Sequence, residues 1–210
     1  MNVQSTMGGT QLFADAPEDT RAAIMRATYA ALTEHGYANL TIQRIADEFE
    51  KSKSLLYHHY DGKDELLVDF LAYMLEHFEA ETSCEACPSP RARLDDLLDR
   101  VVPEELTDEK RAFTSAMVEL RAQASHDGAY REQFTKHDTV LRDRFAGIVS
   151  DGAEAGEFQD VDPETTADFL LAVVNGIRHQ RVTRTDDGGV PTTRAELDSY
   201  LELRLYRGAA

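Results

Sequence analysis

The sequence predicts an all-helical chain of two domains, and three observations support this. Apolar residues recur three and four positions apart in every readable segment, as on one face of a helix. No segment alternates apolar and polar residues as a half-buried strand would. Pro88 and Pro90 separate two groups of helical segments. With 210 residues, 42% of them hydrophobic, the chain can form two small domains with a sizeable core. We expect a flexible tail at 1–16 and domains at 17–77 and 78–210.

The first helix is predicted from Pro17 to His35. Its opening Pro-Glu-Asp suits a helix N-terminus, because proline fits the first turn and carboxylates favour the positive end of the helix dipole. Ile24, Ala27 and Ala31 fall on one face and predict its buried side. Gly36 should end the helix, since glycine readily adopts the positive φ of a helix C-terminus.

Two short helical patterns follow, separated by a break at Glu50 and Lys51. Thr41 is a good N-cap for the first, whose apolar positions are Ile42, Ile45, Ala46 and Phe49. Ser52 can cap the second, which runs from Lys53 to Tyr60 and ends at Asp61-Gly62. Two short helices joined by a tight turn, at about 41–60, predict a helix-turn-helix. Its second helix is of a size to enter a DNA major groove.

The remaining segments all read as helices. We predict them at 63–82, 91–102, 108–125, 128–155, 163–183 and 192–206. The run Phe169–Val174 is apolar on every side, so its helix should be buried on more than one side. The domain core and a second subunit could provide the two burying surfaces. We therefore expect a homodimer built from the last two helices.

The net charge of −17 argues at first against a nucleic-acid partner. Residues 39–63 are an exception, because their four positive charges balance their four negative charges: Arg44, Lys51, Lys53 and Lys63 against Asp47, Glu48, Glu50 and Asp61. Three of the chain's five lysines lie between 51 and 63. The abundance of acidic residues and the scarcity of lysine are typical of proteins from extreme halophiles.

Other classes of protein find little support. No apolar run reaches membrane-spanning length and no signal peptide opens the chain, so we expect a cytoplasmic protein without a membrane partner. No catalytic array, phosphate-binding glycine loop or complete metal motif is present, so we expect no enzyme activity, no cofactor and no metal. His58 and His59 point about 100° apart on a helix and cannot easily chelate one ion.

The same helices carry a family resemblance. The matching residues are Ile24, Ala27, Leu32, Gly36, Tyr37, Thr41, Ile45-Ala46, Ser52-Lys53, Leu56-Tyr57-His58-His59-Tyr60 and Lys63-Asp64-Glu65-Leu66. Over 17–77 the chain resembles the DNA-binding head of the TetR (tetracycline repressor) family. The pattern departs at Glu50 and Lys51, where the family usually has glycine and then an apolar residue. A weaker match, at 152–177, is similar to the end of the family's ligand domain.

A helix-turn-helix places the N-terminal residues of its second helix against base edges. Lys53 could therefore bind guanine and Leu55 a thymine methyl, with Ser54 beside them, while Gln43 is a candidate for adenine. The resemblance assigns phosphate contacts to five residues: Thr41, Tyr57, His58, His59 and Lys63. The alternative is that Tyr57 and His59 are ordinary packing residues.

The resemblance implies a ligand-responsive repressor. It would bind a near-palindromic operator in double-stranded DNA as a dimer and be released by a small effector. We expect the effector to be a mostly apolar molecule, and an anionic molecule is the alternative. Candidate ligand residues are Phe113, Met117, Phe145 and Arg178. The basic cluster of Arg178, His179, Arg181 and Arg184 fits either an anion site or structural salt bridges.

Two alternatives remain. Cys84 and Cys87 form a lone CxxC motif, which fits a redox-responsive regulator or two incidental cysteines. A helical enzyme or carrier with an incidental helix-turn-helix would show no specific DNA binding.

Overall fold

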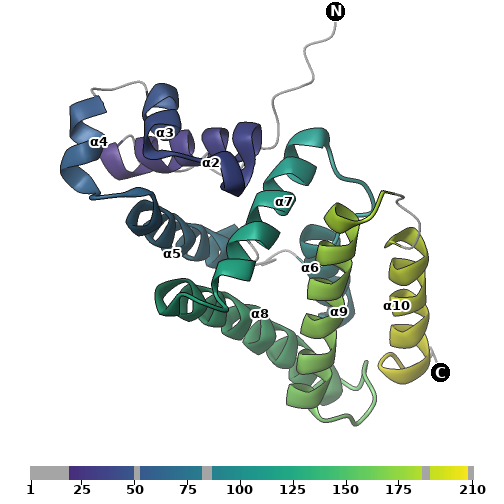
Figure 1. Ribbon diagram of the computed structural model, residues 1–210. Coiled ribbons are helices and arrows are strands. Elements are labelled where there is room, and N and C mark those ends of the chain that lie inside the picture. The colour runs from purple at the N-terminus through teal and green to yellow at the C-terminus, as the bar shows by residue number, and fades with distance from the viewer. Residues whose placement is uncertain (1–18, 50–52, 82–86, 186–189, 208–210) are drawn as a thin grey trace, which may run out of the picture. The chain divides into compact units, whose positions relative to one another are not determined.

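The computed structural model describes residues 19–49, 53–81, 87–185 and 190–207. Their helices are α2 (Thr20–Asn39), α3 (Ile42–Glu48), α4 (Lys53–His59), α5 (Lys63–Glu81), α6 (Pro90–Val101), α7 (Asp108–Gln123), α8 (Gly128–Glu154), α9 (Pro163–Thr183) and α10 (Val190–Arg204) (Figure 1). Within the described ranges no strand forms beyond an isolated antiparallel bridge between Phe158 and Tyr206. The predicted all-α class is thus confirmed. The expected tail at 1–16, the turn Glu50-Lys51-Ser52 and Cys84 lie outside the described residues.

The chain divides into two compact units. The first comprises Met1–Phe78 and Leu106–Phe134, and the second comprises Glu79–Glu105 and Thr135–Ala210. The sequence alone suggested a single boundary near residue 78, which would place α7 in the second domain. The structure groups α7 and the first residues of α8 with the helix-turn-helix instead.

Packing explains why α7 belongs to the first unit. The Phe113 ring lies 4.7 Å from the Tyr29 ring of α2 and 6.3 Å from the Phe70 ring of α5, measured between centroids. Ala116 and Leu120, one and two turns further along α7, are fully buried in the same core. Burying this apolar stripe stabilises the unit by roughly 25 cal/mol for each Å² removed from water.

Helix α2 begins at Thr20, after the predicted start at Pro17, and its helical geometry breaks at Gly36, where the sequence predicts its end. The Asp19 carboxylate caps its N-terminus by accepting a 2.7 Å hydrogen bond from the Ala22 amide. Gly36 has φ 68° and ψ 167°, so the helical geometry is interrupted there before a further turn that ends at Asn39. Glu119 of α7 accepts a 3.1 Å hydrogen bond from the Ala38 amide and holds this turn in place.

The second unit contains α6, most of α8, α9 and α10. Its buried side chains come from all four helices and include Leu94, Leu98, Phe145, Val149, Leu170, Val174 and Leu201. Phe158 closes the turn after α8, and its ring packs against the backbone of Gly152. A Cβ at Gly152 would lie 2.2 Å from Phe158 Cδ2, so only glycine fits at that position.

The C-terminal end of α6 is held by arginines from later helices. Arg178 Nε donates to the Val101 carbonyl at 3.0 Å, and one Arg194 terminal nitrogen donates to the Val102 carbonyl at 3.2 Å. Arg181 reaches the Glu104 carbonyl at 3.5 Å. The last carbonyls of a helix have no partner within the helix and carry partial negative charge, so guanidinium groups suit them. Arg178 and Arg181 of the basic cluster therefore contribute to the fold.

No helix in the described ranges has the length and apolar character needed to cross a membrane.

Candidate nucleic-acid interface

Helices α3 and α4 are anchored by their inner faces. Thr41 caps α3, with its hydroxyl accepting a 3.2 Å hydrogen bond from the Arg44 amide. Ile45 of α3 and Leu56 of α4 are fully buried in the core of the first unit. This burial leaves the outer faces of both helices exposed, which is the arrangement that a helix-turn-helix needs to meet DNA.

Four side chains on these outer faces form a continuous polar chain. Lys53 Nζ makes an ion pair with the Asp47 carboxylate. Gln43 Nε2 donates to the same Asp47 oxygen at 3.1 Å, and the Tyr57 hydroxyl donates to Gln43 Oε1 at 3.1 Å. Hydrogen bonds from Lys53 and then Gln43 lower the pKa of Asp47, so its carboxylate stays ionised. We call this set the polar chain; it joins three of the residues that the sequence assigned to DNA.

The other predicted DNA-binding residues lie around the polar chain. Ser54, His58 and His59 are exposed. Leu55 is half-buried and packs against the core, so only part of it faces outward. Lys63 Nζ lies 4.4 Å from the centre of the Tyr37 ring, a cation–π contact that orients its charge.

The alternative that Tyr57 and His59 are packing residues finds no support in their burial. The Tyr57 side chain is one of the large apolar groups that remain exposed, at 47%, and His59 is exposed as well.

A second network fixes the end of α4. The Tyr60 hydroxyl donates to the Asp69 carboxylate of α5, and Arg21 of α2 donates to the same carboxylate at 2.7 Å. Arg21 also binds Glu76 at 2.9 Å. Burial acts to raise the pKa of Asp69, but the hydrogen bonds and charge of Arg21 and the bond from Tyr60 outweigh it and lower that pKa. The network therefore ties α4 to α2 and α5 through one ionised carboxylate.

Sequence reasoning did not single out Asp47. Asp47 follows Gln43 by four positions, which places both on one helix face, so this contact could be predicted from the sequence. The pairing of Asp47 with Lys53 could not be predicted, because it depends on how α3 and α4 pack together.

The four candidate ligand residues fall in different units. Phe113 and Met117 pack in the first unit, whereas Phe145 and Arg178 belong to the second. Phe145 is fully buried and Arg178 serves the end of α6.

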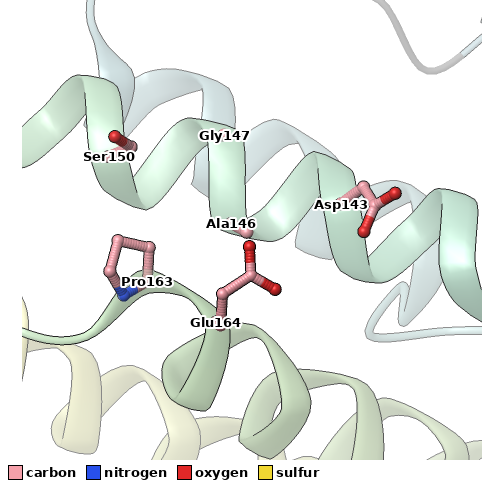
Figure 2. A pocket seen from close by; sticks show the side chains of 6 residues that line it. All are labelled: Asp143, Ala146, Gly147, Ser150, Pro163 and Glu164. Carbon is pink, nitrogen blue, oxygen red and sulfur yellow. The ribbon is translucent and has the colours of Figure 1, made fainter.

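One surface hollow, of about 270 Å³, lies between α8 and the start of α9. Figure 2 shows its lining: Asp143, Ala146, Gly147 and Ser150 on α8, opposite Pro163 and Glu164. Arg142 pairs with Glu164 at 2.8 Å beside it. None of the candidate ligand residues lines this hollow. In the described part of the chain, no three His, Cys, Asp or Glu residues gather as a metal site would require.

A helix-turn-helix whose outer face presents Gln43 and Lys53, together with a second, all-helical unit, defines the class of helix-turn-helix transcriptional regulators. Comparison with known families gives the particular family. The model of bacterial regulatory proteins of the tetR family matches residues 24–70. The model of the BetI-type transcriptional repressor C-terminal domain matches residues 90–205. The chain belongs to the TetR family, as its resemblance to that family implied.

Known relatives agree with this assignment. The transcriptional repressor AcnR of Corynebacterium glutamicum is 25% identical, over 84% of this chain and 89% of its own. The transcriptional repressor SCO4008 of Streptomyces coelicolor is 29% identical, over 75% and 77%. A TetR transcription regulator from Haloarcula marismortui has a solved structure with a TM-score of 0.79 and 38% identity, over 88% of this chain and 97% of that one. These proteins confirm the predictions of a DNA-binding transcriptional repressor and of a chain that is not an enzyme.

Proposed function

We propose that the outer face of α3 and α4 reads a near-palindromic operator in double-stranded DNA. The observation that carries this proposal is the polar chain, which holds Gln43, Lys53 and Tyr57 side by side on an exposed surface. Lys53 reads guanine and Gln43 reads adenine. Ser54 and Leu55 lie beside them at the base edges. Phosphates are bound by Thr41, Tyr57, His58, His59 and Lys63, which fix the register of the protein on the duplex.

The ion pair with Asp47 is compatible with base reading. A lysine ammonium has three donors, so Lys53 can give one to Asp47 and keep two for guanine O6 and N7.

Two lysine variants test this reading. Lys53→Ala should lose a base contact worth about 1–3 kcal/mol and relax preference at one base pair per half-site. Lys63→Ala should instead weaken binding to all sequences and reduce the salt slope by about one. The measurement is the affinity of each variant for a duplex selected by the wild-type protein from randomised DNA and for a scrambled duplex, over a KCl series. Unchanged binding in both variants, with no sequence preference in the wild type, would contradict the proposal.

We propose further that the protein is a homodimer formed by α9 and α10. Two large apolar side chains of these helices remain exposed in the single chain, Phe169 at 40% and Leu203 at 76%. The Phe169 ring lies 4.6 Å from the Tyr200 ring, so the two helices share one aromatic surface. A two-fold dimer would bury the same patch on both subunits, and it would present two heads to a palindromic site.

The effector is proposed to be a small, mostly apolar or anionic molecule of the cytoplasm. Phe113, Met117, Phe145 and Arg178 remain its candidate contacts. Release of DNA requires only that the effector prefers a spacing of the two heads that fits DNA badly.

A redox-responsive regulator is the second candidate, because Cys87 is disulfide-bonded. Cys84, the chain's other cysteine, lies outside the described residues. Reduction by dithiothreitol should change the affinity for the selected duplex in the wild type and not in a Cys87→Ser variant. Equal affinity before and after reduction would remove this candidate.

A further inference from the structure

Asp47 is an unexpected residue for a surface that meets DNA, because a carboxylate repels phosphate. It lies on α3, its side chain is 53% exposed, and it binds two of the proposed base readers at once. Lys53 pairs with it across the turn, and Gln43 donates to it from one helical turn earlier. Both base readers are therefore tethered to the same acidic group.

The hydrogen bonds define the orientation of the Gln43 amide. An ionised carboxylate can only accept, so Gln43 must turn its NH₂ group toward Asp47. The Tyr57 hydroxyl then donates to Gln43 Oε1 on the other side. One amide hydrogen and one oxygen lone pair of Gln43 remain unused by these two bonds. Adenine requires one donor and one acceptor from a glutamine, and this is the pair that remains.

Asp47 acts on Lys53 in a comparable way. The ion pair places the ammonium group beside the outer face of α3. The adjacent negative charge also offsets the attraction of Lys53 to any phosphate, which is the interaction that drives binding to unrelated DNA. The placement of Lys53 favours its binding to a base edge that accepts two hydrogen bonds. The negative charge of Asp47 disfavours the binding of Lys53 to a phosphate.

We propose that Asp47 is a positioning residue that sets the sequence specificity of this DNA-binding head. It fixes the amide of Gln43 and the ammonium of Lys53 for base edges, and it weakens binding to unrelated DNA. This inference rests on the proposed base-reading roles of Gln43 and Lys53.

The test compares Asp47→Asn with Glu48→Gln. Each removes one negative charge from the end of α3, but Glu48 is an exposed neighbour that is not part of the polar chain. The probes are the duplex selected by the wild-type protein and a scrambled duplex. Asp47→Asn should bind scrambled DNA more tightly, and its preference for the selected duplex should fall about tenfold. Glu48→Gln should raise both affinities together and leave the preference within about twofold of the wild type.

Single base-pair substitutions in the selected duplex locate the effect. Asp47→Asn should lose discrimination at the base pairs where Gln43→Ala and Lys53→Ala lose it. Gln43→Ala should add no further loss in the Asp47→Asn background, because residues that act as a unit are not additive. Tight binding to scrambled DNA also shows that Asp47→Asn is folded, and Asp47→Ser replaces it if that binding is lost.

The outcomes separate this inference from the proposed function. If Asp47→Asn and Glu48→Gln change affinities alike and keep the same preference, Asp47 has no positioning role, whereas the base-reading proposal stands. If the wild type prefers no sequence, the base-reading proposal fails and the inference fails with it.

Discussion

At the scale of single residues, the proposed reading of DNA depends on the side-chain bonds that Asp47 and Gln43 make with Lys53 and Tyr57. The helical spacing of Ile45 and Leu56 predicts which sides of α3 and α4 are buried, and so it places Gln43, Lys53 and Tyr57 outside. The bonds among them join residues up to fourteen positions apart, as between Gln43 and Tyr57. Such contacts depend on the packing of α3 against α4, which no local pattern encodes.

Asp69 gives a pH-dependent prediction. Its pKa in the folded chain is lowered by Arg21 and Tyr60, so its contribution to stability is present above the unfolded value of about 3.9 and is lost as pH falls through the folded value. Asp69→Asn should cost about 1–2 kcal/mol of unfolding free energy at pH 7. The difference from the wild type should shrink as pH is lowered from 5 to 3.

Thermal unfolding of both proteins across this pH range measures the effect of Asp69. Glu34→Gln, an exposed substitution elsewhere on the first unit, serves as the control and should leave stability unchanged at every pH. A destabilisation by Asp69→Asn that stays constant down to pH 3 would show that the lowered pKa of Asp69 is not its cause.

At the scale of elements, helix starts were the feature that the sequence predicted best. Helices α4, α5, α7, α8 and α9 begin at the predicted residues, and Thr41, Thr107 and Asp162 cap their helices with side-chain oxygens. The end of α6 was different. The predicted end at 102 lies one residue after the observed end at Val101, but the arginines that satisfy the last carbonyls come from α9 and α10, so they could not be assigned from local sequence.

Arg194 is the residue that tests this helix end. It is 7% exposed and binds Asp99 at 2.9 Å and Asp198 at 3.1 Å, in addition to the Val102 carbonyl. Arg194→Met keeps most of the apolar stem but leaves the carbonyl without this donor, which should cost about 2 kcal/mol of unfolding free energy. Because both carboxylates are exposed, losing their partner should add little.

Chemical denaturation of Arg194→Met and the wild type checks the cost. Arg204→Met, at an exposed position near the end of the same helix, is the matched control and should lie within about 0.5 kcal/mol of the wild type. Equal losses in the two variants would mean that the end of α6 does not depend on Arg194.

At the scale of the whole molecule, the sequence predicted the helical class but not the allocation of helices to units. The apolar face of α7 was readable from Phe113, Met117 and Leu120, yet an apolar stripe does not specify its partner. The structure pairs it with α2 and α5, so residues 106–134 belong with the head. For the same reason, the candidate ligand residues were selected from helices of different units.

The net charge of −17 predicts a salt requirement for stability. An acidic surface repels itself, and salt relieves this repulsion because the Debye length falls to about 3 Å at 1 M. The melting temperature should therefore rise from low to molar KCl. The rise should shrink near pH 4, where many carboxylates are protonated. A melting temperature that is flat or falls with KCl at pH 7 would count against the halophilic interpretation of the composition.

The proposed dimer makes the strongest prediction about the assembled molecule. Phe169 is 40% exposed on α9 and contacts Tyr200 of α10, so Phe169→Asp should leave the single chain folded while placing two charges in the two-fold interface. Sedimentation in high salt should show a wild-type dimer at micromolar protein and a monomeric variant. Ala122→Asp adds the same charge at an exposed site on α7 and should remain dimeric. Because a palindromic operator engages two heads at once, the monomer should also lose affinity for the selected duplex by about a hundredfold or more. A Phe169→Asp protein that stays dimeric would place the interface elsewhere, and a monomeric wild type would rule the dimer out.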